Sequence, residues 1–268
     1  RERAYFLANS DKYHLVETVE DILTAKQQNK LAVSFHFQGT NPIEYDLNMV
    51  ETYYKLGVRH MLMAYNTKNA VGDGCYELGD GGLSRLGVRL IEEMNRVGMI
   101  ADGSHTGYRT TMEMFEVSKD PVIFSHSNPR AICEHSRNIR DDQIQACAAS
   151  GGVIGITGVS LFLGDHQAST NSVIDNIKYI SDLVGPQHVG LGLDYIADQQ
   201  ALAQKIDSMT AWTPPGDAFE FQPQETVKYF QPEQLPELTE TLLKRDYSES
   251  EIRGILGENW LRVASQVW

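Results

Sequence analysis

Residues 84–105 read SRLGVRLIEEMNRVGMIADGSH, and this stretch contains the repeating unit that decides the fold. Apolar side chains recur at helical spacing up to Val97, and a short apolar run follows at 98–103. The run ends on polar residues, Asp102, Ser104 and His105. A helix that leads directly into a short buried strand is typical of α/β proteins, because parallel strands need a crossover connection.

The same unit recurs along the chain. Apolar runs that predict strands lie at 31–37, 59–64, 98–103, 121–125, 152–157 and 188–193. Stretches with helical periodicity lie at 84–97, 106–117, 138–150 and 171–184. An open doubly wound sheet and a closed (β/α)8 barrel both fit this alternation. No G-x-G-x-x-G follows a strand, which argues against a dinucleotide-binding open sheet, whereas a barrel would need strands beyond these six.

Composition sets the class of protein. With 268 residues, 41% of them hydrophobic, the chain can bury the core of one large domain or of two small ones. A net charge of −13 argues against nucleic acid as a partner. No apolar run approaches the roughly 20 residues that span a bilayer. Three scattered cysteines and the lack of a signal peptide at the start of the sequence predict a reducing, bacterial-type cytoplasmic location.

The last part of the chain differs from the repeating unit. We expect a single barrel domain over residues 1–268, with a C-terminal loop and helix at about 195–268. The polar, proline-containing section 213–236 predicts a long loop. Ser248 and Glu251 form a capping-box pattern that predicts the start of one final helix.

Polar side chains gather where the predicted strands end. In the first run, Ala32, Ser34, His36 and Gln38 share one face, and Leu31, Val33, Phe35 and Phe37 share the other. We expect the polar face to line a barrel interior and the apolar face to pack against helices. In the last run, Gly190 and Gly192 are expected to leave space on its face.

Other strand ends carry ionisable groups, namely Asp102 with His105, then His126, then Asp194. The carboxyl ends of barrel strands meet at one rim, where active sites lie. Two imidazoles and a carboxylate from separate strands suit Zn²⁺, which takes nitrogen and oxygen ligands and acidifies bound water. Each residue taken alone fits a structural role better, as a hydrogen-bonded histidine or a helix-capping aspartate.

Four motifs occur in order along the chain: GLSRLG with EMNRVGMIADGSH (82–105), FSHSNPRAICEHSRNIRDD (124–142), GLGLDY (190–195) and GENWLRV (257–263). As a set they resemble the membrane (renal) dipeptidase family of zinc peptidases. The resemblance implies a (β/α)8 TIM-type barrel of the metal-dependent hydrolase type. It also implies a homodimer and a zinc-dependent dipeptidase that hydrolyses short dipeptides with a metal-activated water.

The resemblance assigns roles to individual residues. His105 and His126 match two zinc ligands, and Asp102 matches a residue that orients the ligands. Arg137 would bind the C-terminal carboxylate of the dipeptide, for which a planar guanidinium is well suited. Asp194 would transfer protons and contact the free amino group of the substrate.

The sequence departs from the family pattern at three points. The H-x-D of the first barrel strand is absent from the 268 residues, so we expect that strand upstream of Arg1. Gln38 matches a glutamate that bridges two metal ions, and a neutral amide bridges two cations poorly. Tyr65 matches a histidine that stabilises an oxyanion, and its hydroxyl can donate the same hydrogen bond. We expect one firmly held zinc ion, and two only if upstream residues supply the missing pair.

Two other functions fit these departures. Because Gln38 and Tyr65 change the pocket, the protein could be a related metal-dependent amidohydrolase that acts on a non-peptide amide. Alternatively, it is a catalytically degenerate member of the family that binds a ligand without turnover.

The remaining candidate residues are expected to be structural. His36 is expected to be a hydrogen-bonded histidine of the barrel interior rather than a metal ligand. His135 and His166 fall in polar loops and are expected to be exposed. Cys133 and Cys147 fall in semi-apolar helical stretches and are expected to be small core residues.

Overall fold

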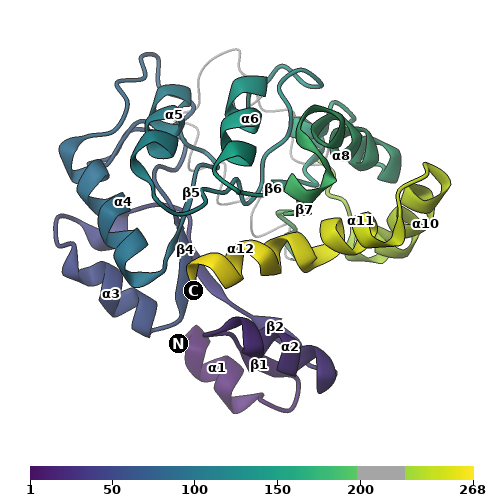
Figure 1. Ribbon diagram of the computed structural model, residues 1–268, viewed down its shortest axis with the longest axis horizontal. Helices are drawn as coiled ribbons and strands as arrows, with labels where there is room; N and C mark the ends of the chain where they lie inside the picture. Colours follow the sequence, from purple (N-terminus) through teal and green to yellow (C-terminus); the bar gives the residue numbers. More distant parts are fainter. Residues whose placement is uncertain (198–226) are drawn as a thin grey trace.

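The computed structural model describes residues 1–197 and 227–268. These residues form a mixed α/β structure in which short parallel strands lie at the centre and helices surround them (Figure 1). Residues 198–226, and with them most of the predicted loop at 213–236, lie outside the described part of the chain.

The central strands form one parallel series. Its members are β3 (Phe35–Phe37), β4 (Val58–Leu62), β5 (Ile100–Asp102), β6 (Ile154–Ile156) and β7 (Val189–Leu191). Strands β3, β4 and β5 pair in parallel, and so do β6 and β7. Parallel bridges from Asp102 to Ile123 and from Phe124 to Ile154 place the predicted strand 121–125 between β5 and β6. The carboxyl ends of all these segments therefore share one edge.

The predicted helical stretches are confirmed. The helices that follow the central strands are α3 (Asn48–Lys55), α4 (Arg85–Val97), α5 (Tyr108–Val117), α6 (Asp141–Ala149), α7 (Ser160–Leu163) and α8 (Thr170–Val184). Helix α4 begins where the Ser84 hydroxyl accepts the N–H of Gly87 and ends at Gly98, whose φ of 84° lies in the left-handed region that favours glycine. Its buried Leu90 and Met94 pack with Met61 of β4 in one hydrophobic core.

The N-terminal part of the chain differs from the prediction. Helix α1 (Glu2–Ala8), β1 (Tyr13–Leu15), α2 (Val19–Gln27) and β2 (Leu31–Val33) form a small unit at the lower end of Figure 1. The run 31–37, predicted as one strand, divides at Ser34, because β2 pairs with β1 whereas β3 pairs with β4. Leu31 is consequently 64% exposed instead of packing against helices.

The C-terminal part contains the 3₁₀ turn η5 (Pro232–Gln234), then α10 (Leu235–Lys244), α11 (Glu249–Arg253), the π-helical turn η6 (Gly254–Glu258) and α12 (Asn259–Val267). The capping box of Ser248 and Glu251 is confirmed. The single final helix is wrong, because the backbone of Gly257 is non-helical and separates α11 from α12. Helix α10 was not predicted.

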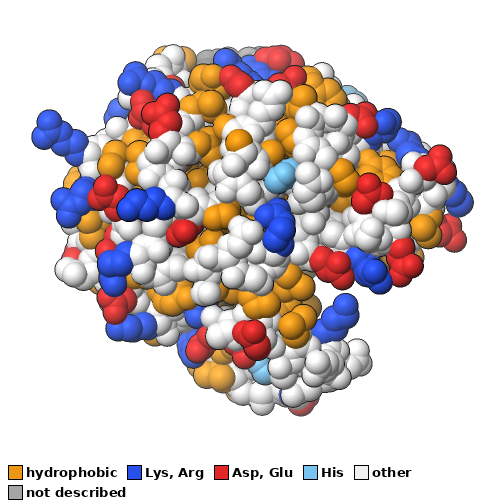
Figure 2. Space-filling view, in the orientation of Figure 1, with side chains coloured by type: hydrophobic (Ala, Val, Ile, Leu, Met, Phe, Trp, Pro, Cys, Tyr) orange, Lys and Arg blue, Asp and Glu red, His pale blue; other side chains and the backbone are white. Residues whose placement is uncertain are grey.

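Helix α12 closes the amino end of the central strands. Its Trp260 and Val263 pack with Ile100, Ile123 and Val153, which lie at or before the start of their strands. Figure 2 shows hydrophobic atoms gathered between α12 and the N-terminal unit, where α12 contacts α2. The opposite, carboxyl end of the strands is left for the predicted site. Within the described residues, no helix has the length and apolarity needed to cross a membrane.

Glycines in the central strands allow the backbones to approach closely. The space expected at Gly190 and Gly192 is filled, because a β-carbon there would collide with the Trp260 indole and the Ser125 carbonyl respectively. A β-carbon on Gly155 would likewise overlap the Ser125 carbonyl oxygen. The segment that leads to His126 therefore lies directly against the neighbouring backbones.

We predict that Gly155→Ala lowers the free energy of unfolding by about 1–3 kcal/mol, because the collision is with backbone. Urea unfolding measures the change. Gly79→Ala is the matched control, since no atom lies within 4 Å of its β-carbon position, and it should change stability by less than about 0.5 kcal/mol. Equal stability of the two variants would contradict the close packing.

Candidate active site

Every residue predicted for the site, except Arg137 and Asp102, follows the carboxyl end of a central strand. The residues are Gln38 after β3, Tyr65 after β4, His105 after β5, His126 after the segment bridged at Ile123 and Phe124, and Asp194 after β7. Asp102 is the last residue of β5. The strand series thus gathers residues from distant parts of the sequence at one edge.

The two predicted zinc ligands face each other. The Nε2 atoms of His105 and His126 lie 2.9 Å apart. Nδ1 of His105 lies 2.6 Å from Oδ1 of Asn66, which only accepts hydrogen bonds, so the proton of His105 lies on Nδ1 and the lone pair of Nε2 points at His126. Nδ1 of His126 lies 2.7 Å from the Ser125 hydroxyl. Asn66, which fixes the His105 tautomer, was not predicted from the sequence.

Burial keeps both imidazoles neutral. The pKa of His105 lies well below its usual value because the ring is buried and because Arg137 and His126 lie nearby. The pKa of His126 is lowered by burial and by Arg137, although the Asp102 carboxylate opposes this shift. Two neutral imidazoles with converging nitrogen atoms are the form that binds a metal ion.

Asp102 holds the two histidine turns together. Its carboxylate is fully buried, and Oδ1 accepts the backbone N–H groups of Ser104 at 2.9 Å and Ser125 at 3.1 Å. The Ser104 hydroxyl in turn accepts the backbone N–H of His126 at 3.0 Å. These hydrogen bonds link the turn that carries His105 to the turn that carries His126.

A second pair of histidines lies beside Asp102. His36 stacks on His60 with ring centroids 4.5 Å apart, and Nε2 of His60 lies 3.9 Å from Oδ2 of Asp102. The expectation of an interior His36 is wrong, because this residue is exposed. Burial and the neighbouring His36 lower the pKa of His60 well below its usual value.

Arg137 lies beside the two imidazoles. Its side chain is buried, and Nη2 donates to the backbone carbonyl of His126 at 3.4 Å. Within the described residues, its Nε and Nη1 have no hydrogen-bond partner. His135, predicted to be exposed, is 1% exposed, because its ring packs against Phe162 and its Nδ1 accepts the Arg137 backbone N–H at 3.0 Å. His135 thus fixes the backbone from which Arg137 extends.

The pKa values of Asp194, Tyr65 and Tyr229 are raised by burial near the carboxyl ends of the central strands. Burial raises the pKa of Asp194, and Arg137 and His36 partly oppose the shift. Tyr65 stacks on His105 with ring centroids 4.1 Å apart, and burial raises the pKa of its hydroxyl. Burial, Asp194 and Tyr65 raise the pKa of Tyr229 to about 12, and this residue was not predicted from the sequence.

The histidines fit two positions of a metal site. Their donor atoms converge, and their Nδ1 atoms are both held by polar neighbours, as in metal-ligating histidines. No group of three or more histidine, cysteine, aspartate or glutamate side chains suited to a metal ion occurs in residues 1–197 and 227–268. Gln38 is exposed at the same strand edge.

The other candidate residues are mostly structural. Cys147 is buried in α6, as expected, whereas Cys133 is half-buried in an irregular segment instead of a helix. His166 is exposed, as expected.

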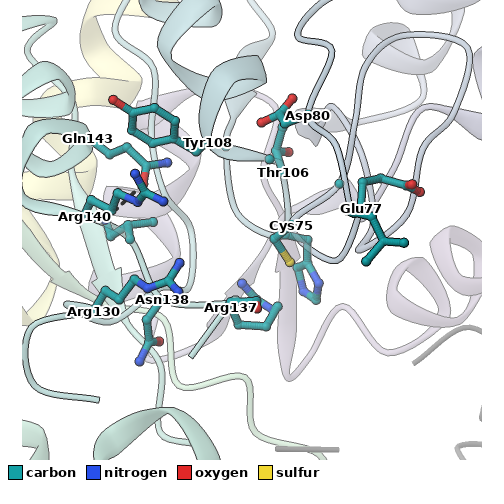
Figure 3. A pocket seen from close by; sticks show the side chains of 17 residues that line it. Cys75, Glu77, Asp80, Thr106, Tyr108, Arg130, Arg137, Asn138, Arg140 and Gln143 are labelled. Atoms are coloured by element: carbon teal, nitrogen blue, oxygen red, sulfur yellow. Dashed lines mark hydrogen bonds between the residues drawn. The ribbon is translucent and has the colours of Figure 1, made fainter. Parts of the chain in front are cut away.

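A pocket opens beside His105 and Arg137. Its volume is about 290 Å³, and its wall includes Tyr108, Arg130 and Arg140 (Figure 3). The pocket therefore reaches one predicted zinc ligand, His105, and the buried guanidinium of Arg137.

We predict that the metal-free protein loses stability in weak acid. A histidine in an unfolded chain has a pKa of about 6.5, and burial lowers the folded-state pKa of His60, His105 and His126. Below pH 6.5 the unfolded chain therefore binds more protons. Stability that is fully present above this pH is lost as the pH falls, at up to about 1.4 kcal/mol per pH unit for each histidine.

Urea unfolding between pH 7.5 and 5.5 in the presence of a chelator measures this slope. His60→Gln should reduce the slope by up to one proton, because glutamine does not titrate. A slope that is identical in wild type and His60→Gln would show that His60 is not held neutral.

Comparisons with known proteins identify the family of this chain. The family model described as membrane dipeptidase (peptidase family M19) matches residues 3–210. Dipeptidase verJ of Clonostachys rogersoniana is 30% identical over 260 residues, which are 96% of this chain and 61% of that protein. The chain therefore spans less than two thirds of that relative's length.

Solved structures with a similar fold include two hydrolases. An amidohydrolase from Pseudomonas aeruginosa is 36% identical with a TM-score of 0.87, over 98% of this chain and 81% of that chain. A metallo peptidase from Rhodobacter sphaeroides, liganded with a phosphinate mimic of the dipeptide L-Ala-D-Ala, has a TM-score of 0.76 over 96% of this chain and 69% of that chain. At 22% identity, the second likeness shows the shared fold alone.

Proposed function

The chain belongs to the membrane dipeptidase family, and on that premise we propose that it is a zinc-dependent dipeptidase that hydrolyses the peptide bond of short dipeptides. One observation carries the proposal. The Nε2 atoms of His105 and His126 converge at 2.9 Å, and the buried Arg137 beside them has unpaired N–H groups. The converging Nε2 atoms are suited to bind a metal ion, and the unpaired N–H groups of Arg137 are suited to bind a carboxylate. The dipeptide mimic bound to the related metallo peptidase supports the same substrate class.

We propose further that the central strands are part of a (β/α)8 barrel. The unbroken parallel order from β3 to β7, with helices between successive strands, supports this architecture. In a barrel the carboxyl ends of the strands surround one site, which is where His105, His126 and Asp194 lie.

His105 and His126 would hold one zinc ion through Nε2. Zinc at this position would act as a Lewis acid on the scissile carbonyl and acidify the attacking water. Asn66 and Ser125 hold the rings in the orientation that the ligands need. Gln38 contributes no charge, so a second ion held by this part of the chain is not proposed.

Arg137 would bind the C-terminal carboxylate of the substrate. A guanidinium forms strong, charge-assisted hydrogen bonds with a carboxylate, and its Nε and Nη1 have no partner among the described residues. An unpaired buried cation is costly, so a bound carboxylate would offset that cost. This contact requires a carboxylate close to the scissile bond and therefore selects dipeptides over longer peptides.

Asp194 and Tyr65 would act on the substrate directly. The raised pKa of Asp194 makes its carboxylate a better proton acceptor, suited to transfer a proton to the leaving amine and to contact the free amino group. The raised pKa of Tyr65 keeps its hydroxyl protonated, so it can donate a hydrogen bond to the oxygen that becomes negatively charged.

The test combines metal analysis with a hydrolysis assay on Ala-Ala. We expect bound zinc and hydrolysis that stops when a chelator removes the metal. His126→Gln should lose both zinc and activity, whereas His166→Gln, at an exposed site, should keep both. Bound zinc without dipeptide hydrolysis would point to a non-peptide amide as substrate. A metal-free, inactive protein would contradict the proposal.

We predict that Arg137→Gln lowers kcat/KM for Ala-Ala by about 100-fold or more, because a buried charge-assisted contact is lost. For Ala-Ala amide, which lacks the carboxylate, the wild-type enzyme and the variant should be similarly slow. The ratio of the two substrates in each protein is the measurement. A variant that loses activity equally on both substrates would indicate that Arg137 has another role.

A further inference from the structure

The pocket beside the site extends beyond the contact proposed for the substrate carboxylate. From His105 and Arg137 it continues past Tyr108 to Arg130 and Arg140. Figure 3 shows Arg130 and Arg140 on one side of the pocket, Glu77 and Asp80 on the other, and Arg137 nearer the middle beside Cys75. A dipeptide whose C-terminal carboxylate lies at Arg137 would place its C-terminal side chain near this arginine wall.

The arginines of this wall differ in how far their charge is already neutralised. Nε of Arg130 donates to Glu134 at 2.7 Å, so its charge has a partner. Neither Arg137 nor Arg140 forms an ion pair with any of the residues that the structure describes. The wall therefore offers two positive charges, one for each of two carboxylates.

The acidic residues of the pocket are engaged elsewhere. Oε1 of Glu77 accepts the backbone N–H of Lys68 at 2.6 Å. Oδ1 of Asp80 accepts the Thr110 hydroxyl and the Gly82 backbone N–H, each at 3.0 Å. These carboxylates hold the surrounding loops and do not contact the arginine wall.

Arg140 is held in a defined position although it is exposed. Its guanidinium lies 4.5 Å from the ring centroid of Tyr108, whose hydroxyl donates to Asp142 at 2.6 Å. The Arg140 backbone N–H donates to Gln143 at 3.0 Å and fixes the start of α6. Stacking occupies the face of a guanidinium and leaves its edge N–H groups for a planar acceptor such as a carboxylate.

We propose that Arg140 is a specificity-determining residue that selects dipeptides with an acidic C-terminal residue, aspartate or glutamate. Arg137 binds the main-chain carboxylate, and Arg140 binds the side-chain carboxylate across the pocket. The inference rests on the proposed dipeptidase function.

The test compares Ala-Glu with Ala-Gln, which has nearly the same shape and no charge, on the zinc-loaded protein at low salt. We expect kcat/KM to be about tenfold higher for Ala-Glu, chiefly through a lower KM. Arg140→Gln should remove most of this preference and change kcat/KM for Ala-Gln by about twofold at most. Because ions screen an exposed charge pair, 0.5 M salt should also reduce the preference.

Arg109→Gln is the matched control. It removes the same charge from nearby α5, where Arg109 pairs with Glu113 at 2.8 Å, and Arg109 does not line the pocket. The control should keep the preference for Ala-Glu. Equal rates on both substrates in wild type, or an equal loss on both in Arg140→Gln, would overturn the inference and leave the dipeptidase function standing. No hydrolysis of any dipeptide would overturn both.

Discussion

The buried carboxylate of Asp102 is the contact on which the site depends. One of its oxygen atoms accepts backbone N–H groups from Ser104 and Ser125, and so joins the turns that carry His105 and His126. A fully buried carboxylate is costly unless it is hydrogen-bonded. Its position at the end of β5 meets that condition for Oδ1, because the next segment of the parallel series brings Ser125 within reach. Oδ2 has no hydrogen-bond partner among the described residues and lies 3.9 Å from Nε2 of His60. The parallel strand order thus places the hydrogen bonds of Asp102, and these hydrogen bonds bring the two imidazoles together.

The electrostatics of the site follow from burying Arg137 beside these rings. Its positive charge lowers the pKa of both imidazoles and partly offsets the rise that burial causes in Asp194 and Tyr65. The two imidazoles are therefore neutral and can act as nitrogen ligands to a metal ion, although the nearby carboxylate of Asp102 would favour the charged form. The same cation has unpaired N–H groups directed at no described residue. A site with neutral nitrogen donors and an unmatched positive charge is suited to a ligand that brings a carboxylate.

Local sequence patterns were sufficient for the central strands from residue 59 onward and for the helices between them, because short apolar runs and helical spacing reflect burial that each segment needs by itself. They were insufficient where a partner distant in sequence decides. The division at Ser34 depends on β1 and β4 competing for neighbouring residues of one run. The burial of His135 depends on Phe162, and the role of Asn66 depends on a histidine 39 residues later. No pattern around His135 or Asn66 contains that information, and only the family resemblance distinguished Arg137 from other arginines.

Backbone conformation explains why these side chains converge. Asn66, His105 and Asp194 have φ values of 61°, 64° and 54°, in the left-handed region that non-glycine residues seldom adopt. Each follows a central strand, and each would continue away from the edge if its backbone stayed extended. The left-handed residue instead redirects the chain within one position, and the side chain points across the edge.

Such a conformation costs on the order of 1 kcal/mol per residue and persists because surrounding contacts hold it. The Asn66 side chain is hydrogen-bonded to His105, and the backbone carbonyl of His105 accepts the N–H of Cys75. Three described positions with this conformation therefore lie at the candidate site, where backbone strain helps to position functional groups. Asn29, Glu44, Ala168 and Asp246 adopt the same conformation away from it.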